Sequence, residues 1–421
     1  MEQREENREK VIIAGLHTGS RDYLNDTTDE SMRELGELVD TAGGEVVGEM
    51  VQNRPVPDSG TYFGEGKLEE LKQAVDALDA TLVVFDDELS PIQLRNISDI
   101  LGVRVLDRSM LILDIFAMRA RSGEGKLQVE LAQLKYQLPR LRGMGLELSR
   151  TGGGIGTRGP GETKLESDRR HIRTRIAALE EQIREIKKHR ELLRNRRHKD
   201  GHITGAIVGY TNAGKSTLLN RLTDAGVFAE DKLFATLDTT SRAITLDDNR
   251  QIILIDTVGF IRKLPHYLVE AFKSTLEEAA DADFVIHVTD ASSIEADNHI
   301  TVVDAVLDEI GAGGKPVINV YNKCDIDNFC HPRDNGKNVF ISAKTGQGMQ
   351  DLLDAIADTA PGKKYERTLL IPYSDGGVLN SLHTNEKVLS EEYIADGVLI
   401  KVLIDEAVYG ALKNYETNEG Q

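Results

Sequence analysis

The chain has 421 residues and a net charge of −19, from 51 Lys and Arg against 70 Asp and Glu, with two cysteines and no tryptophan. At ~150 residues per domain, this length predicts two to four domains. No stretch approaches the ~18 consecutive apolar residues of a membrane-spanning helix, so we expect no membrane span. The N-terminus lacks the apolar region of a secretory signal, and two cysteines are too few for a disulfide framework, so we expect a cytoplasmic protein.

The first 118 residues alternate short β-rich runs with helical patterns. Apolar runs such as VIIAGL, TLVVFDD and VRVLD are separated by segments with the period of amphipathic helices. Strands that alternate with helices are typical of a parallel sheet. We therefore predict an N-terminal α/β domain over residues 1–118.

Residues 119–200 have a different pattern, with two long helical repeats around a glycine-rich break. Leucines recur at helical spacing from Leu127 to Leu141, and isoleucine and leucine recur at steps of four and three from Ile172 to Ile186. The segment TGGGIGTRGPGET lies between them. This arrangement predicts a long antiparallel helical hairpin with a glycine-rich tip.

The same segment, 119–200, is the basic part of an acidic chain. It holds 21 Lys and Arg against 11 Asp and Glu, a net charge of +10, which leaves −29 for the remainder. A basic element between acidic flanks is expected where one part of a protein contacts phosphate. The alternative is an ordinary solvated helix surface.

A second α/β series begins with the strand pattern ITGAIVG and predicts a domain over residues 201–361 with a mostly parallel sheet. Pro361, Gly362 and two lysines are typical of a linker. The remaining residues, 362–421, contain two strand patterns and short helical ones, which predict a small α+β domain. The predicted fold class is therefore α/β, with a hairpin and an α+β C-terminal domain.

The sequence GYTNAGKST follows the apolar run AIV and fits the pattern G-x-x-x-x-G-K-[ST]. In this P-loop pattern, glycines let backbone N–H groups surround phosphates, the lysine reaches the β and γ oxygens, and the hydroxyl binds Mg²⁺. We expect nucleotide contacts from the whole loop: Gly209, Tyr210, Thr211, Asn212, Ala213, Gly214, Lys215, Ser216 and Thr217.

Three further motifs follow in the order expected of a guanine-nucleotide site, each at the end of an apolar strand. In DTVG, a carboxylate holds Mg²⁺ through water and a backbone N–H meets the γ-phosphate. In NKCD, an Asp accepts from two guanine N–H groups that adenine lacks, which favours GTP over ATP. The predicted contacts are Asp256, Thr257, Val258, Gly259, Asn322, Lys323, Cys324, Asp325, Ser342, Ala343 and Lys344.

Between the P-loop and DTVG, a threonine should close on Mg²⁺ when the γ-phosphate is bound. Thr236 is our choice, with Thr239 and Thr240 as alternatives, and we expect Phe234, Ala235, Leu237 and Asp238 to line the nucleotide. The predicted Mg²⁺ site then comprises Ser216, Thr236 and, through water, Asp256.

Position 260 departs from the Ras-like pattern, in which a Gln after Asp-x-x-Gly orients the attacking water. Phe260 can neither donate nor accept a hydrogen bond, so we expect slow intrinsic hydrolysis and leave the water-orienting group unassigned. The catalytic candidates are Lys215, Thr236 and Gly259. Phe260 could also simply pack against a helix.

With these motifs in view, the chain resembles the HflX family of translation-associated P-loop GTPases. The resemblance covers roughly residues 11–360 and includes DDELSPIQLRNI, the run from VLDRSM to YQLPRL, and the glycine-rich segment GGGIGTRGPGETKLESDRR. The family usually has a proline where this chain has Thr239, which leaves Thr236 as the matching Mg²⁺ ligand.

The resemblance implies a GTPase that binds the large ribosomal subunit and, in some members, splits ribosomes. The hairpin is then the element expected to contact rRNA, since Lys and Arg neutralise phosphates and glycines allow close backbone approach. Its tip can also be read as a plain helix-helix connection. We expect a monomer with these RNA contacts: Arg150, Gly152, Gly153, Gly154, Arg158, Arg169 and Arg170.

Two other hypotheses stay open. The N-terminal domain could carry nucleotide-driven RNA remodelling of its own, or the chain could be a GTP-dependent switch for a protein partner. The GEGK sequences at 64–67 and 123–126 do not continue as P-loops, and we interpret both as turns that open helices. Cys324, Cys330 and His331 lack a fourth zinc ligand, so we expect no metal besides Mg²⁺.

Overall fold

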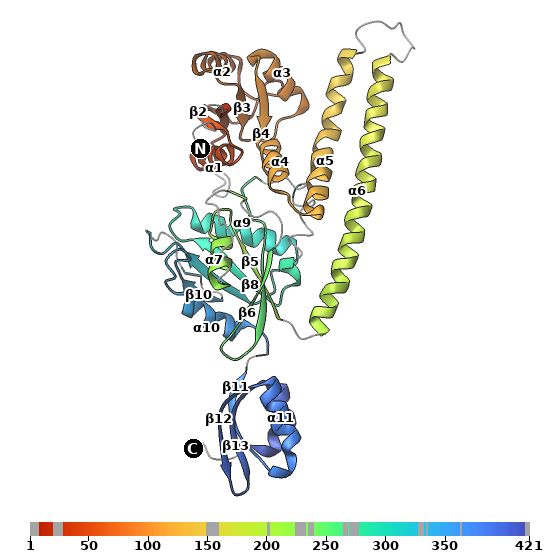
Figure 1. Cartoon of the computed structure of the whole chain (residues 1–421). Coiled ribbons are helices and arrows are strands. Elements are labelled where there is room, and N and C mark those ends of the chain that lie inside the picture. The colour runs from red at the N-terminus through yellow and green to blue at the C-terminus, as the bar shows by residue number, and fades with distance from the viewer. Residues whose placement is uncertain are drawn as a thin grey trace.

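The structure is a computed structural model, and it describes residues 8–19, 28–148, 160–199, 203–223, 233–234, 240–263, 268, 278–326, 332–333, 336–362 and 364–416. It is a mixed α/β chain in which two parallel-rich sheets follow one another, with a pair of long helices beside them (Figure 1). No helix among these residues is long and apolar enough to cross a membrane.

The N-terminal sheet is parallel and has the strand order β2-β1-β3-β4. Strands β1, β3 and β4 are mostly apolar and buried, as expected when both faces are covered, whereas the edge strand β2 has no fully buried residue. Helices pack on both faces, so alternate residues of β1 enter two different apolar cores. The bounds are β1 Lys10–His17, α1 Thr28–Thr41, β2 Glu45–Asn53, α2 Glu65–Leu78, β3 Leu82–Phe85, α3 Pro91–Leu101, β4 Arg104–Asp107 and α4 Arg108–Arg119.

Local sequence signals set several helix ends in this domain. Helix α3 begins with a capping box between Ser90 and Gln93, has proline at its first position, and ends at Gly102 in a left-handed conformation. The two GEGK sequences open helices, because Gly64 is the N-cap of α2 and Gly123 is the first residue of α5. The interpretation of both as helix-opening turns is confirmed.

Helices α5 (Gly123–Leu148) and α6 (Pro160–Lys199) lie side by side (Figure 1). Helix α5 continues past Pro139, and its buried face packs on α3 and α4. Ion pairs join the two helices, including Arg175 with Glu130 at 2.6 Å. The glycine-rich segment between them lies outside the described residues.

The second sheet has six strands in the order β10-β9-β8-β5-β7-β6, parallel except for β6. Its central strands are fully buried, and helices α7, α9 and α10 cover it. The bounds are β5 Ile203–Gly209, α7 Lys215–Leu222, β6 Thr240–Thr245, β7 Gln251–Asp256, β8 Phe284–Asp290, α9 Ala296–Glu309, β9 Val317–Asn322, β10 Lys337–Phe340 and α10 Met349–Thr359.

The C-terminal part is a three-stranded antiparallel sheet in the order β11-β13-β12 with helices on one face (Figure 1). Arg250, just before β7, donates to the carbonyl oxygens of Ala360 at 2.9 Å and Pro361 at 3.0 Å, which fixes the chain at the end of α10 before the C-terminal part begins. The bounds are β11 Tyr365–Ile371, α11 Gly376–Asn385, β12 Lys387–Ile394, β13 Gly397–Ile404 and α12 Glu406–Leu412.

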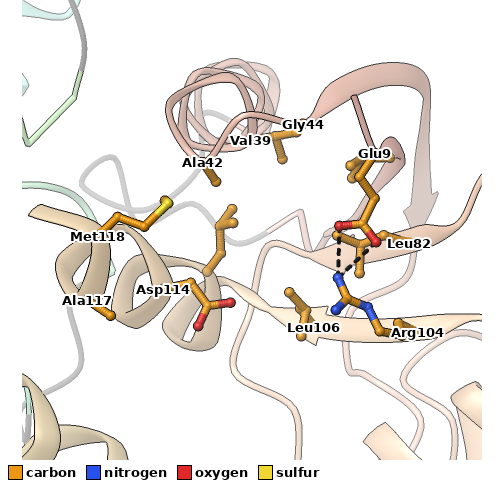
Figure 2. Close-up of a pocket in the computed structure, with 12 residues that line it drawn as sticks. Glu9, Val39, Ala42, Gly44, Leu82, Arg104, Leu106, Asp114, Ala117 and Met118 are labelled. Atoms are coloured by element: carbon orange, nitrogen blue, oxygen red, sulfur yellow. Dashed lines mark hydrogen bonds and ion pairs between the residues drawn. The ribbon is translucent and has the colours of Figure 1, made fainter. Parts of the chain in front are cut away.

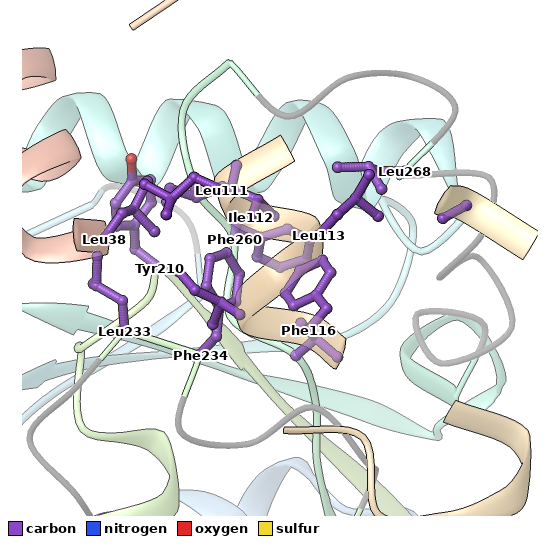
Figure 3. Close-up of a cluster of buried hydrophobic side chains, with 14 of the residues drawn as sticks. Leu38, Leu111, Ile112, Leu113, Phe116, Tyr210, Leu233, Phe234, Phe260 and Leu268 are labelled. Carbon is purple, nitrogen blue, oxygen red and sulfur yellow. The ribbon is translucent and has the colours of Figure 1, made fainter. Parts of the chain in front are cut away.

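An apolar cluster connects the N-terminal sheet domain to the second one. Side chains from α4 of the first domain pack against side chains that follow β5 and β7 of the second (Figure 3). Phe116 and Phe234 meet edge to face, with ring centroids 4.7 Å apart. The members labelled in the figure are Leu38, Leu111, Ile112, Leu113, Phe116, Tyr210, Leu233, Phe234, Phe260 and Leu268.

Candidate nucleotide-binding site

The P-loop lies where β5 turns into α7, and two of its glycines are required by close packing. Gly209 has φ 154°, and a Cβ there would lie 2.1 Å from the carbonyl oxygen of Val288. Gly214 has φ 90°, and a Cβ there would lie 2.3 Å from the amide nitrogen of Asn322. Only glycine fits both positions, so the loop can wrap tightly at the N-terminus of α7.

Lys215 lies at the centre of this loop and is almost completely buried. Its Nζ donates to the carbonyl oxygens of Gly209 at 3.1 Å and Tyr210 at 2.7 Å. Burial lowers the pKa of the ammonium to about 8, although nearby Asp256 favours the charged form. An ammonium held in place by backbone carbonyls in this way is available to phosphate oxygens.

A hydroxyl and a carboxylate meet beside the lysine. The Oγ of Ser216, at the start of α7, donates to Oδ2 of Asp256 at the end of β7, over 2.8 Å. Asp256 is only 1% exposed. Hard oxygen donors of this kind, few in number and next to a phosphate site, fit Mg²⁺, which keeps several waters and takes the rest of its ligands from phosphates.

Asn322 ties the P-loop to the loops that were predicted to contact the base. Its Nδ2 donates to the carbonyl of Ala213, and its Oδ1 accepts from the N–H of Ala343, both over 2.9 Å. The exposed Asp325 carboxylate has a lowered pKa, because the Ser342 hydroxyl donates to it and Lys344 and Lys323 lie nearby. An ionised carboxylate at this edge can accept two N–H groups of a guanine.

The DTVG segment runs directly over the P-loop. Thr211 N–H donates to the carbonyl of Phe260 over 2.7 Å, and Phe260 N–H donates to that of Gly209 over 3.2 Å. A Cβ on Gly259 would lie 2.9 Å from both Nζ of Lys215 and Cα of Thr211, so a side chain has no room there. The fold thus brings together the predicted residues of the P-loop, DTVG, NKCD and the Ser342 loop.

Several predicted residues lie outside the described part of the chain and have no structural account. These are Ala235, Thr236, Leu237, Asp238, Thr239, Arg150, Gly152, Gly153, Gly154 and Arg158. Phe234 is described, and its ring is buried in the interdomain cluster. Thr240 begins β6 and pairs with Asp256. Of the two α6 arginines, Arg170 is exposed and Arg169 partly so.

The contacts between Tyr210 and the N-terminal domain were not found from the sequence. Its hydroxyl donates to Oε1 of Glu34, from α1, over 2.5 Å and accepts from the N–H of Arg262 over 2.8 Å. The ring stacks on His299 with centroids 3.8 Å apart. Glu34 also pairs with the buried Arg108. The one signal in the sequence was the presence of a tyrosine inside the phosphate loop, and it does not indicate which residues the tyrosine contacts.

A six-stranded, mostly parallel sheet, a P-loop with its lysine and hydroxyl in place, and an NKCD loop beside it define a GTP-hydrolysing P-loop GTPase. Family models agree: "GTP-binding GTPase N-terminal" matches residues 29–117, "GTP-binding GTPase Middle Region" 119–197, and "50S ribosome-binding GTPase" 204–323.

Comparison with curated proteins then gives the family. The chain is 50% identical to GTPase HflX of Caldanaerobacter subterraneus over 99% of this chain and 95% of that protein. It is 44% identical to GTPase HflX of Escherichia coli over 89% of each. The chain belongs to the HflX family of GTPases. A solved GTP-binding protein from Sulfolobus solfataricus in complex with GDP is 26% identical, over 83% of this chain and 98% of that one, with a TM-score of 0.45.

Proposed function

We propose that this GTPase binds the large ribosomal subunit through rRNA, and that the subunit stimulates its GTP hydrolysis during splitting, rescue or quality control of ribosomes. The observation that carries the proposal is the basic pair of helices, α5 and α6, attached to a GTPase domain. The family model of that domain is described as a 50S ribosome-binding GTPase, which supports the same partner. The proposed setting is the cytoplasm, with the protein as a monomer.

We assign the chain four units: 1–118, the hairpin 119–200 with its glycine-rich tip, the GTPase domain 201–361, and the small α+β domain 362–421. The hairpin is coupled to the GTPase domain at its base, since Arg190 of α6 pairs with Glu278 at 3.6 Å and also with Glu124 of α5. Binding of the subunit at the far end of this helix pair can therefore affect the GTPase domain through the contacts at its base.

In the proposed site, the P-loop amides and Lys215 hold the β- and γ-phosphates, and the N–H of Gly259 meets the γ-phosphate. Asp325 reads the base. Ser216 and Thr236 would hold Mg²⁺, with Asp256 acting through water, and the ion would supply charge neutralisation on the phosphates. The phenyl ring of Phe260 has no polar group to orient a water, and it is buried in the interdomain cluster. Slow intrinsic turnover and stimulation by a partner fit this arrangement.

The test is steady-state GTP hydrolysis, alone and with purified large subunits across a salt series, with ATP as the control nucleotide. We expect strong stimulation that weakens as salt rises, because phosphate contacts release counterions. Stimulation that is indifferent to salt would instead indicate a contact with ribosomal protein. No stimulation at any salt concentration would refute the proposed partner.

The RNA surface is tested separately by replacing Arg150, Arg158, Arg169 and Arg170 with Gln. We expect loss of subunit binding with GTP affinity unchanged, since none of these residues belongs to the nucleotide-binding motifs. A control removes the same charge elsewhere, by replacing Arg33, Arg104, Lys401 and Lys413. If the control loses as much binding as the hairpin variant, the surface is wrong and only net charge matters.

A further inference from the structure

The NKCD loop carries an ammonium group close to the carboxylate that is proposed to read the base. The loop is a tight turn, because the N–H of Ile326 donates to the carbonyl of Lys323 over 3.0 Å. Asp325 lies on the same turn. The hydroxyl of Ser342 lowers the pKa of the Asp325 carboxyl most, and the ammonium groups of Lys344 and Lys323 lower it further. Lys323 is therefore within electrostatic reach of the oxygens that a guanine needs.

The ammonium of Lys323 pairs with a different carboxylate. Its Nζ lies 2.8 Å from Oδ2 of Asp290, the last residue of β8, and both side chains are partly buried. Asp290 is in register with Asn322 at the end of β9, so the pair lies at the carboxyl edge of two adjacent parallel strands. Lys323 has φ 66°, a conformation that non-glycine residues rarely adopt. This backbone conformation sets the direction in which the lysine side chain leaves the loop.

The carboxylate of Asp290 is fixed from its other side. Its Oδ1 accepts from the N–H of Ser292 over 3.0 Å and from the Oγ of Ser292 over 2.6 Å. This local turn is typical of an aspartate that follows a strand. The two oxygens therefore have separate partners: Oδ1 is held by the loop after β8, and Oδ2 is turned towards Lys323.

This ion pair affects what the exposed carboxylate of Asp325 can bind. Guanine presents two N–H groups, and an ionised carboxylate has two oxygens to accept them. An ammonium that paired with Asp325 would compete with the base for those oxygens. Pairing with Asp290 gives the ammonium a carboxylate of its own and leaves both oxygens of Asp325 to the base.

We propose that Asp290 is a positioning residue for guanine specificity, which holds the ammonium of Lys323 away from Asp325. Asp290 acts through the lysine and does not itself contact the base. The inference rests on the proposed nucleotide site, in which Asp325 reads the guanine. It adds to that site a residue at the end of β8 that belongs to none of the four nucleotide motifs.

The first test is Asp290→Asn, which keeps an oxygen for Ser292 but places an amide N–H₂, a donor, opposite the ammonium. Equilibrium binding is measured with GDP and with inosine diphosphate, which lacks the exocyclic amine and offers Asp325 one N–H. We expect the Kd for GDP to rise ~5-fold, the size of one exposed ion pair. The Kd for inosine diphosphate should rise less than ~2-fold, because one free oxygen of Asp325 is enough for it. The preference for GDP over inosine diphosphate therefore falls.

A double-mutant cycle then tests whether Asp290 acts through the lysine. In a Lys323→Met background there is no ammonium to hold, so adding Asp290→Asn should change the Kd for GDP by less than ~1.5-fold. A merely structural defect would persist in that background. Glu309→Gln removes the same charge from an exposed position of α9 and is the control, with no change expected. Ser292→Ala, which loosens Oδ1 of Asp290, should lower the preference for GDP by ~2-fold.

Three results would overturn the inference: an unchanged preference for GDP over inosine diphosphate in Asp290→Asn, equal losses of affinity for the two nucleotides, or a full effect of Asp290→Asn in the Lys323→Met background. If Asp290→Asn does not fold, an unchanged preference in Ser292→Ala overturns it instead. The wild-type protein separates these failures from a failure of the base site. If the wild type binds GDP no better than ADP, the base site is wrong. If the wild type prefers GDP and Asp290→Asn keeps that preference, the site stands and this role falls.

Discussion

Two parallel-rich sheets follow one another in this chain, and the carboxyl edges of their parallel strands differ in chemistry. In the second sheet, β5 ends in a glycine loop followed by Lys215 and Ser216. In the first, β3 is followed by Asp86 and Asp87, and β4 ends in Asp107. Open α/β sheets bind their ligands at this edge. One edge is built for an anion, whereas the other is built for cations.

The cations at the acidic edge come from the protein itself. Asp86 pairs with Arg108 at 2.8 Å and with Lys263, from the segment after DTVG, at 2.5 Å. Lys263 also pairs with Asp87 at 2.7 Å. An acidic edge repels phosphate, so it does not favour a nucleotide site in the N-terminal domain. The two sheets therefore have the same kind of carboxyl edge, and the charges at that edge determine whether it binds a ligand or the neighbouring domain.

Among the cavities of the described residues, one of about 350 Å³ lies at the opposite end of the first sheet (Figure 2). It is lined by apolar residues of α1, β3, β4 and α4, and at its rim Arg104 donates to both carboxylate oxygens of Glu9. Asp114 also lines it, and burial raises the pKa of that carboxyl. The residues that line this cavity do not resemble the phosphate loop of the second sheet.

The largest expected effect concerns the acidic edge. Replacing Arg108 by Met leaves the carboxylates of Glu34 and Asp86 buried without their main cation, which should cost ~3–5 kcal/mol in the free energy of unfolding. Urea unfolding measures it. The control is Arg104→Met, an exposed pair with Glu9 that should cost ~1 kcal/mol or less. Equal effects of the two variants would contradict a buried ionic edge.

The other edge is tested through its specificity. Asp325→Asn replaces an acceptor of two guanine N–H groups by a side chain that accepts one and donates one. We expect the preference for GTP over ATP, measured by equilibrium binding, to fall at least ~50-fold. Asp351→Asn, an exposed acid in the first turn of α10, should leave it unchanged. A full preference for GTP in Asp325→Asn would place base recognition elsewhere.

A pH series sharpens the description of the anion edge. Burial lowers the pKa of Lys215 to about 8 in the nucleotide-free protein, and bound phosphate favours the ammonium form. Binding therefore takes up a proton, and nucleotide affinity should fall as pH rises through 8, by about fourfold from pH 7 to 8.5. Lys215→Arg stays charged and should lose this dependence. Equal pH profiles for both proteins would mean that another group titrates.

The smallest expected effect is at Lys263, which is partly exposed. Lys263→Ala should cost ~0.5–1 kcal/mol in stability, because Asp86 keeps Arg108. A double-mutant cycle with Asp87→Asn should show coupling of similar size. The control is the exposed pair of Lys337 and Asp358 on the second sheet domain. If the stability changes of Lys263→Ala and Asp87→Asn are strictly additive, the two side chains do not interact, which would contradict the proposal that this edge binds the neighbouring domain.

The sequence alone determined the parts of the molecule that depend on local spacing. The P-loop, DTVG and NKCD motifs each follow an apolar strand, and Gly209 and Gly214 stand at the motif positions where the loop must turn tightly. Parallel strands bring their carboxyl ends to one edge, so the nucleotide site followed from the order of elements. The amphipathic repeats likewise indicated the helices α5 and α6.

Only the tertiary structure decided what the remaining polar groups do. The hydroxyl of Tyr210 meets Glu34, 176 positions away in the sequence, and Lys263 meets Asp86 across a similar separation. The burial of Phe260 depends on packing against α4 of the other domain. Contacts between side chains far apart in the chain leave no periodic signal in the sequence, because they are fixed by how two domains dock rather than by any local pattern.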